Sequence, residues 1–513
     1  MLRLSRVPIL WRWKRWVWTS WQLLRFRLSR PQAIGEPGPN RGRLEVVPLG
    51  QIYPRIPLNE VLVVKRSPKE EAPIGMRVVV KIGLVLNRLI SQMRSGLREI
   101  ADDPRQALED ARIARYAKAF RWPVRPSIFD APGALDLGRL AVESPYAVLL
   151  ERDPDGALCW DLRRLTDFEH HDGLCSLGLQ VTFAQPDGSE RLLASRIESI
   201  DVGVVHPEDD AWEGAVLLAV CAATTHLALA RHFMAVHLVS GDHWDVATRN
   251  HLPIDHPLYR LLWPHIFNSF YTNYAVTPPQ MLPDGDFVNM FSFTHTGLMA
   301  YFDEMYSGYD IAATDPVADW ARRGLGDETF ECPSQANLID LFELMHAHAS
   351  RYLGAYYDSD EAVLADPAVR AWLAELAALV PNGIGPVAAD PTRAGLARLI
   401  GGYMYEGNTI HDLVGTTLWD YQLWADRTPV RVYRDGRRVP LDVFQRMLNN
   451  NFALQIRRAP LLADYSHVAL DPAGAALFTQ FFEECRALQS RYDGTPTGPW
   501  RMEPKNLEIN MNG

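Results

Sequence analysis

The sequence contains few cysteines and no long uninterrupted apolar run. Its five cysteines are scattered without a close pair, so we expect neither a disulfide framework nor a thiolate metal site, and a reducing compartment such as the cytoplasm is favoured. No stretch of eighteen uncharged apolar residues occurs, and no membrane-spanning helix is therefore expected. Internal repeats and low-complexity tracts are absent as well. Together these absences argue against a disulfide-rich, membrane-spanning or repeat protein and favour an ordinary globular protein.

Composition and charge distribution narrow the class further. The 513 residues are 47% hydrophobic and 22% charged, as expected of a soluble globular protein with a sizeable core. The formal net charge is −10, and because residues 1–35 contribute +8 with eight Lys/Arg and no Asp/Glu, the remaining chain carries −18. An acidic body of this kind is not the profile of a nucleic-acid-binding protein, so no nucleic-acid partner is expected.

Residues 1–35 are predicted to form a basic, tryptophan-rich arm. The aromatic and cationic residues that alternate along it are Trp11, Trp13, Trp16, Trp18 and Trp21 with Arg12, Lys14, Arg15, Arg25 and Arg27. Tryptophan favours the headgroup level of a bilayer and cations favour anionic lipid, so peripheral membrane contact is one interpretation. The other is that the arm packs on its own body or on a partner subunit. No apolar run of signal-peptide type follows the charges, and export is not expected.

The pattern of the remaining chain predicts a mainly α-helical protein. Residues 31–75 are rich in Pro and Gly and are expected to form an extended linker or wrapping segment. Helical spacing of apolar residues recurs over 75–120, and from Trp212 it continues almost to the end of the chain. The division predicted from this pattern is a basic arm (1–35), a linker with N-terminal helices (36–120) and a helical catalytic domain (121–513).

Minor β-structure is predicted where Asp-Gly pairs stand between alternating or β-branched flanks. Such pairs are the strongest short-range signal for a hairpin turn. The three predicted hairpins turn at Asp155–Gly156, Asp187–Gly188 and Asp435–Gly436.

Three histidines share one predicted helix, and histidine is the most frequent transition-metal ligand. They are His226, His232 and His237. An interval of five turns the side chain by about 140° in an α-helix, whereas a π-bulge with about 4.4 residues per turn brings His232 and His237 to within roughly 50°. His226 and His237 nearly share an α-helical face, but about 16 Å of helix separates them, too far for one ion. On spacing alone a metal-free helical core is the favoured interpretation, and a π-wound metal-binding pair of His232 and His237 is the alternative.

Over residues 212–326, the sequence around these histidines resembles that of the lipoxygenase family. The segments that carry the resemblance are "ATRNHLP" (247–253), "DHPLYRLLWPH" (255–265) and "PVADWARRGL" (316–325), with "DLGRLAVESPYAVLLER" (136–152) upstream. The resemblance implies a large, mainly α-helical catalytic domain built around a long metal-binding helix. It also implies a short, bacterial-type member that lacks the family's N-terminal β-sandwich domain.

The resemblance implies a non-haem iron site, and the ligand types are compatible with manganese as well. Position by position, His232 matches the family's second ligand and His237 its third histidine, which does not usually bind metal. The first-ligand position falls on Leu227, next to His226. Two assignments stay open: either His226 reaches the ion, or the ligand pair has shifted to His232 and His237.

The later ligand positions implied by the family lie towards the C-terminus. The segment "YEGNTIHDLVGTTLWDYQLW" (405–424) places a histidine ligand at His411, and Gly415 stands where the family has Asn or His. Glu406 could enter the sphere in its place, and a solvated or salt-bridged Glu406 is the alternative. The tail "RMEPKNLEINMNG" ends at Gly513, whose main-chain carboxylate would be the last ligand.

The implied reaction is hydrogen abstraction from an unsaturated fatty acid or a related lipophilic substrate, followed by O₂ insertion. The altered ligand set keeps two alternatives open. One is an oxidase or oxygenase of specialised metabolism on the same scaffold, and the other is a metal-free lipophile-binding descendant. The expected partners are thus a lipophilic small molecule and O₂, with membrane contact through residues 1–35.

Overall fold

The protein is described from a computed structural model. The residues that the structure describes are 33–38, 42–68, 81–82, 85, 125–186, 190–270, 276–328, 330–439, 443, 446–447, 459–496, 498 and 500–511. Residues 1–32 of the predicted arm, nearly all of the helices predicted over 75–120, and Gly513 lie outside these residues. Predictions on those segments stay predictions.

Helices make up most of the described chain, which confirms the mainly α-helical fold class. The α-helices are α2 (Leu49–Ile52), α5 (Leu137–Glu143), α6 (Trp212–His226), α7 (Asp242–His251), α8 (Pro257–Ile266), α9 (Thr277–Met281), α10 (Asp286–Met290), α11 (His295–Ser307), α12 (Pro316–Arg322), α13 (Pro333–Tyr356), α14 (Asp360–Ala365), α15 (Pro367–Leu379), α16 (Gly385–Ala389), α17 (Arg393–Tyr405), α18 (Leu418–Gln422) and α20 (Pro472–Asp493). The π-helices are η6 (Leu227–Gly241), η9 (Glu406–Ile410) and η10 (Leu413–Thr417). The 3₁₀ helices are η3 (Ser127–Asp130), η4 (Pro145–Leu149), η5 (Arg163–Asp167), η8 (Ile311–Thr314), η11 (Ser466–Val468) and η12 (Pro504–Asn506).

The strands of the described residues form two small antiparallel sheets. A two-stranded sheet pairs β1 (Val46–Pro48) with β2 (Leu62–Val64). A five-stranded sheet has its strands in chain order: β3 (Glu151–Arg152), β4 (Leu158–Asp161), β5 (Leu179–Ala184), β6 (Leu193–Ser199) and β7 (Gly203–Val205). Each strand pairs with its sequence neighbour, so the sheet is a simple meander at the edge of a helical body.

Two of the three predicted hairpins are confirmed. β3 and β4 join at Asp155–Gly156, where Gly156 has a φ of 86°, a left-handed conformation that favours glycine. β5 and β6 pair as predicted, although the turn residues 187–189 lie outside the described part. The third prediction is wrong as a hairpin.

At the third Asp-Gly pair a turn forms without a pair of strands. The Gly436 N–H donates to the Tyr433 carbonyl at 3.0 Å, but Tyr433 forms its β-bridge with Leu174. The Cys175 N–H likewise donates to the Val432 carbonyl at 2.9 Å. The segment before the turn therefore pairs with residues 173–175, and no strand pairs with it across the turn in the described part of the chain.

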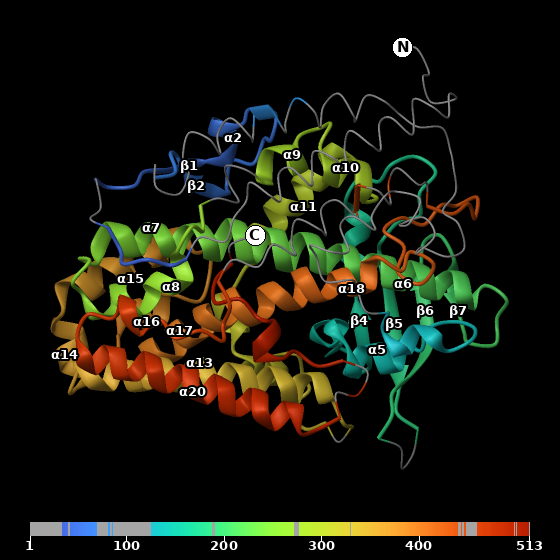
Figure 1. Cartoon of the computed structure of the whole chain (residues 1–513). Coiled ribbons are helices and arrows are strands. Elements are labelled where there is room, and N and C mark those ends of the chain that lie inside the picture. The colour runs from blue at the N-terminus through green and yellow to red at the C-terminus, as the bar shows by residue number, and fades with distance from the viewer. Residues whose placement is uncertain are drawn as a thin grey trace.

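A continuous helix from Trp212 to His251 runs through the middle of the molecule (Figure 1). Most residues of its central part are apolar, as expected of a helix surrounded by other helices, and Leu227, Leu229 and Val236 are fully buried. Among the described residues it is the one helix long and apolar enough to cross a membrane, yet 72% of its most apolar window is buried inside the protein. This burial is that of a core helix.

Other helices enclose this central helix. α13 packs along α17, α20 packs on α13, and α15 packs on α7. The five-stranded sheet lies at the α6 end of the central helix, and the β1–β2 sheet lies over α7 at the other end (Figure 1). One hydrophobic core links nearly all of these elements, so the middle of the central helix is shielded from water.

Residues 42–68 wrap around α7, in keeping with the predicted wrapping segment. The Val64 N–H donates to the buried carboxylate of Asp242 at 2.6 Å. Asn250 binds the backbone of Leu44 twice, accepting from its N–H at 2.7 Å and donating to its carbonyl at 3.0 Å. These contacts fix the segment to the helix that carries the candidate site.

Candidate metal centre

Three buried histidine side chains converge inside the helical body and are called the histidine cluster: His232, His237 and His411. One ring nitrogen from each lies within 4.8 Å of the others. The two Nε2 atoms of His232 and His237 are 3.1 Å apart, and the ring centroid of His411 is 5.2 Å and 4.9 Å from those of His232 and His237. Within the described part of the chain, no other group of three metal-ligating side chains is this close.

π-Helical winding puts these histidines on facing sides of two helices. His232 and His237 belong to η6, and His411 lies between η9 and η10 on the helix that continues α17. A π-turn has about 4.4 residues, so two residues five apart are separated by little more than one turn and their side chains point in similar directions. The winding predicted from the spacing is confirmed, and it extends over 15 residues of the central helix.

Burial keeps the three imidazoles neutral. It lowers the pKa of His411 to about 4, and burial together with the neighbouring histidines holds the pKa of His232 and of His237 well below the ordinary histidine value. A neutral imidazole has a lone pair free for a metal ion. The cluster is therefore in its ligating protonation state at neutral pH.

The donor set fits a divalent metal ion. Neither ring nitrogen of His411 has a hydrogen-bond partner among the described residues, and a buried polar atom left unpaired costs free energy. Two imidazole nitrogens bound to one ion at about 2.1 Å and at a right angle would lie about 3.0 Å apart. The 3.1 Å between His232 Nε2 and His237 Nε2 is close to that value.

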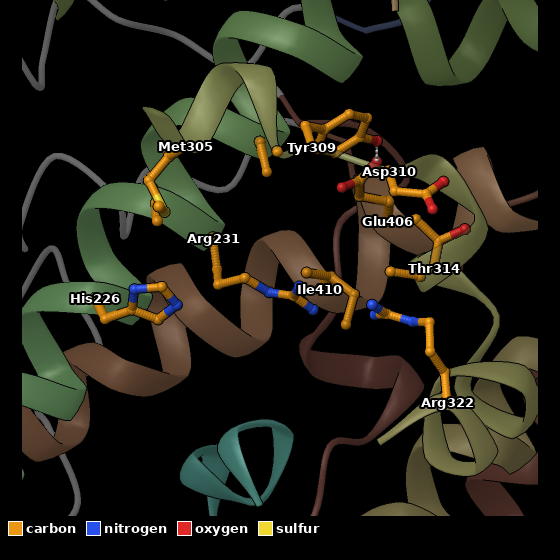
Figure 2. A pocket seen from close by; sticks show the side chains of 13 residues that line it. His226, Arg231, Met305, Tyr309, Asp310, Thr314, Arg322, Glu406 and Ile410 are labelled. Atoms are coloured by element: carbon orange, nitrogen blue, oxygen red, sulfur yellow. Dashed lines mark hydrogen bonds between the residues drawn. The ribbon is translucent and has the colours of Figure 1, made fainter. Parts of the chain in front are cut away.

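His226 and Glu406, the two other candidate side chains, lie beside the histidine cluster and not in it. His226 Nδ1 is 2.9 Å from the Tyr301 hydroxyl. The carboxylate of Glu406 accepts hydrogen bonds from Ser240 Oγ and from the Tyr309 hydroxyl, the latter at 2.7 Å. Both residues line a neighbouring pocket (Figure 2).

Gly415 faces the histidine cluster directly. A Cβ atom at this buried position would lie 2.9 Å from Nε2 and 3.1 Å from Cε1 of His232. The close approach requires glycine, because any side chain would press on the imidazole ring. The position where the family has Asn or His therefore brings only backbone to the site.

The C-terminal tail is anchored beside His411. The Glu508 N–H donates to the Asp412 carboxylate at 2.8 Å. The Ile509 carbonyl lies 2.8 Å from His265 Nδ1. The tail is thus fixed by the residue that follows the third histidine of the cluster.

Met511 carries the tail between the two π-helices. Its side chain is the nearest group that a Cβ would meet at Gly241 (3.0 Å) and at Gly407 (2.9 Å). Gly241 lies four residues after His237, and Gly407 lies four residues before His411. Met511 thus lies between the helices that carry the histidine cluster, while Gly513, the predicted last ligand, lies outside the described residues.

By sequence the chain is similar to plant lipoxygenases. It is 25% identical to linoleate 9S-lipoxygenase 2 of Solanum tuberosum over 227 residues, which are 42% of this chain and 26% of the relative. It is 21% identical to seed linoleate 9S-lipoxygenase-3 of Pisum sativum over 276 residues, 50% of this chain and 31% of the relative. The match thus spans about a third or less of these relatives, and no family model matches the chain.

The fold agrees with solved lipoxygenase structures. A calcium-dependent 11R-lipoxygenase superimposes with a TM-score of 0.71 at 14% identity, over 91% of this chain and 79% of that one. The chain is lipoxygenase-like in its fold. A coral 8R-lipoxygenase gives a TM-score of 0.65 at 13% identity, over 100% of this chain and 83% of that one. The lipoxygenase fold predicted from the sequence is confirmed.

Two features of the candidate site could not be predicted from the sequence. Asp412 stands out in the sequence only as an acid in an apolar helical stretch, and its contact with Glu508 joins segments 96 residues apart. Met511 is an ordinary apolar residue until Gly241 and Gly407 are known to face it. Glycines on both helices indicate that some group approaches them closely, but the sequence does not show that this group is Met511.

Proposed function

We propose that this protein is a lipoxygenase-like non-haem iron oxygenase that acts on an unsaturated fatty acid or a related lipophilic chain. The observation that carries the proposal is the convergence of three buried histidines from η6 and from the helix that continues α17. Burial lowers the pKa of each and so favours the neutral, ligating form. An imidazole set of this kind suits iron, and manganese is the second metal compatible with a mixed histidine and carboxylate set.

The proposed ligands are His232, His237 and His411, with the main-chain carboxylate of Gly513. The metal ion would supply the redox chemistry for hydrogen abstraction, and O₂ would be the second substrate. The protein's own contribution is to hold the ligands, to orient the chain and to exclude water through the apolar surroundings of η6. His226 is proposed as a positioning residue, because its ring is held by Tyr301.

An oxidase or oxygenase of specialised metabolism on the same scaffold is the second candidate. The observation that favours it is Gly415, which brings no ligating side chain to a position facing His232. Fewer side-chain ligands would leave more of the coordination sphere to substrate or solvent. The third candidate is a metal-free lipophile-binding protein, which would be supported if the protein binds no metal ion.

We propose a cytoplasmic protein, because all five cysteines are free and scattered. The division into an arm (1–35), a linker with helices (36–120) and a catalytic domain (121–513) is kept, with the arm as the part that would touch membrane lipid.

Metal analysis of freshly purified protein is the decisive experiment. We expect close to one equivalent of iron or manganese; less than about a tenth of an equivalent after reconstitution would reject both enzyme functions. His232→Ala should lose the metal, whereas His206→Ala, an exposed histidine in a loop, should keep it. A variant ending at Asn510 should also lose metal; full retention there would reject the carboxylate ligand.

Oxygen uptake separates the first two functions. With linoleate or arachidonate, a fatty-acid oxygenase should consume O₂ in proportion to its metal content. A metal-loaded protein that consumes none with either acid would instead support the second candidate, and screening of other lipophilic chains would follow.

A further inference from the structure

A pocket of about 610 Å³ lies at the α6 end of the central helix, where that helix meets the five-stranded sheet. Its walls are the β6–β7 turn, the first two turns of α6 and residues 425–439, which follow α18. None of its described lining residues belongs to the histidine cluster, and Leu218 and His232 are roughly 20 Å apart along the central helix. The pocket is therefore separate from the candidate metal centre.

The size and the lining of this pocket suit a ligand with an apolar body. Its volume of about 610 Å³ lies within the roughly 300–1,000 Å³ of pockets that enclose a drug-sized ligand. The apolar residues of the lining include Val202, Leu217, Leu218, Pro429, Val432 and Val439. A ligand that covers these side chains removes them from water, and this transfer is favourable.

Arg431 brings a positive charge to this pocket without a negative one beside it. Its Nε donates to the Phe291 carbonyl and its Nη2 to the Val288 carbonyl, both at 2.8 Å. These acceptors are uncharged, and no carboxylate in the part of the chain that the structure describes lies within ion-pair distance of the guanidinium. Burial lowers the pKa of Arg431 below the ordinary arginine value, because a charge held out of water without a counter-charge costs free energy. An anion bound beside Arg431 would offset this cost.

The carboxylates of the lining are engaged elsewhere or exposed to water. Asp201 pairs with Arg434 at 2.7 Å, and Asp426 lies 3.6 Å from Arg125. Glu213 is exposed at the start of α6, where water surrounds its charge. The described lining holds four arginines and these three carboxylates, so the pocket keeps an excess of positive charge.

The turn at Gly436 adds an aromatic ring and a second cation to the pocket. The guanidinium of Arg437 lies over the Tyr433 ring, 4.4 Å from its centroid, and both residues line the pocket. The Nε atom of Arg437 is also 3.4 Å from Asp435. Planar arginine side chains and aromatic rings stack on the flat faces of other rings. A flat ligand therefore gains contacts here that a flexible chain does not.

We propose that this pocket binds an aromatic organic acid, with Arg431 as the main contact of the acid group. The apolar side chains of the β6–β7 turn and of α6 would enclose its rings, and Tyr433 with Arg437 would contact their flat face. A rigid ring system also loses less conformational freedom on binding than a flexible chain of the same size. The proposal is independent of the proposed oxygenase function, because no step of that reaction involves this pocket.

The test measures the binding of two fluorescent probes to the full-length protein. They are 8-anilino-1-naphthalenesulfonate and N-phenyl-1-naphthylamine, which has the same rings without the sulfonate. We expect about one bound sulfonate probe per chain. Since Arg431→Met removes a charge-assisted contact, it should weaken binding of the sulfonate about tenfold or more. The uncharged amine should change less than about twofold, because it has no acid group for the guanidinium to bind.

Three further variants sharpen the result. Leu217→Trp fills the pocket from α6 and leaves its charges in place, so it should weaken both probes about fivefold or more; it also decides the matter if Arg431→Met does not fold. Arg431→Lys keeps the charge without the planar fork and should recover part of the affinity for the sulfonate. Arg486→Met, at an exposed arginine on α20 paired with Glu483, is the matched control and should bind both probes as the unaltered protein does.

Several outcomes would overturn the proposal. One is equal weakening of both probes in Arg431→Met, and another is unchanged binding of the sulfonate in Leu217→Trp. Displacement of the sulfonate by decanoate as effective as that by naphthalene-2-carboxylate would reject the assignment to an aromatic acid. Chelator-treated protein should bind the sulfonate as the metal-loaded protein does; loss of binding together with the metal would place the probe at the histidine cluster instead.

Discussion

Gly415 controls how closely the second π-helix approaches His232. In Gly415→Ala the new methyl group would stand 2.9 Å from the Nε2 atom, so the ring must turn away from His237 and His411. We expect metal content to fall by about half or more while the fold is kept, since an overpacked contact costs about 1–3 kcal/mol. Metal content per folded protein is the measurement.

Gly214→Ala is the control for that substitution. Gly214 lies near the start of α6, and a Cβ there would meet nothing within 4 Å. Replacing a helical glycine in open space should leave metal content unchanged. If Gly415→Ala retains as much metal as Gly214→Ala, the histidine cluster is not the metal site or tolerates displacement of His232.

His348 is one of several buried histidines that we expect to lower the stability of the protein in acid. Its ring stacks on Phe481 with centroids 4.4 Å apart, and neither nitrogen has a hydrogen-bond partner among the described residues. Burial lowers its pKa from 6.5 to about 3. The unfolded chain therefore binds a proton below pH 6.5 that the folded protein refuses until about pH 3, and stability falls as the pH drops through this window.

We expect His348→Phe to remove this loss of stability at low pH. Each pKa unit corresponds to about 1.4 kcal/mol, so between pH 7 and pH 5 the unaltered protein should lose about 2 kcal/mol of unfolding free energy that the variant keeps. Urea unfolding at the two pH values measures the difference. An identical pH dependence in both proteins would show that His348 does not control acid stability.

At the scale of elements, local spacing predicts the winding of the central helix but not its extent. The interval between His232 and His237 is enough to indicate a π-turn, because it is a property of one short segment. The 15-residue length of η6 and the matching π-turns around His411 depend on how two helices pack.

The contact between Asp412 and Glu508 joins two elements, the His411 helix and the C-terminal tail. Asp412→Ala removes the acceptor of the Glu508 N–H, and losing one hydrogen bond to a buried carboxylate should cost about 1.5–3 kcal/mol. We expect faster hydrogen exchange over residues 505–511 and lower metal content. Asp412→Asn keeps an oxygen acceptor at the same place and should be close to normal in both measurements. Unchanged exchange in the alanine variant would mean that other contacts hold the tail.

At the scale of the whole molecule, the fold class, the family resemblance and the core were predictable because they depend on hydrophobic pattern and on long ordered motifs. The assignment of His226 was left open by the sequence because a one-residue ambiguity on a helix moves a side chain to another face. Figure 1 shows why packing decides it: the central helix is enclosed by helices from distant parts of the chain. Only their arrangement selects which histidines face His411 and which face Tyr301.

Metal binding should stabilise the whole protein, because the three histidines belong to two helices that unfolding separates. A ligand present at about 100 times its dissociation constant and bound only by the folded state adds about 2.7 kcal/mol. We therefore expect the chelator-treated protein to unfold a few degrees lower than the iron-loaded protein, in a scan made without oxygen. His411→Ala should unfold at the same temperature with and without iron, since it removes the one proposed ligand on the second helix. His295→Ala is the control: the His295 ring contacts the Met281 carbonyl and not the histidine cluster, so this variant should keep the iron-dependent shift. An iron-dependent shift of equal size in His411→Ala would place the stabilising ion elsewhere and separate metal binding from the histidine cluster.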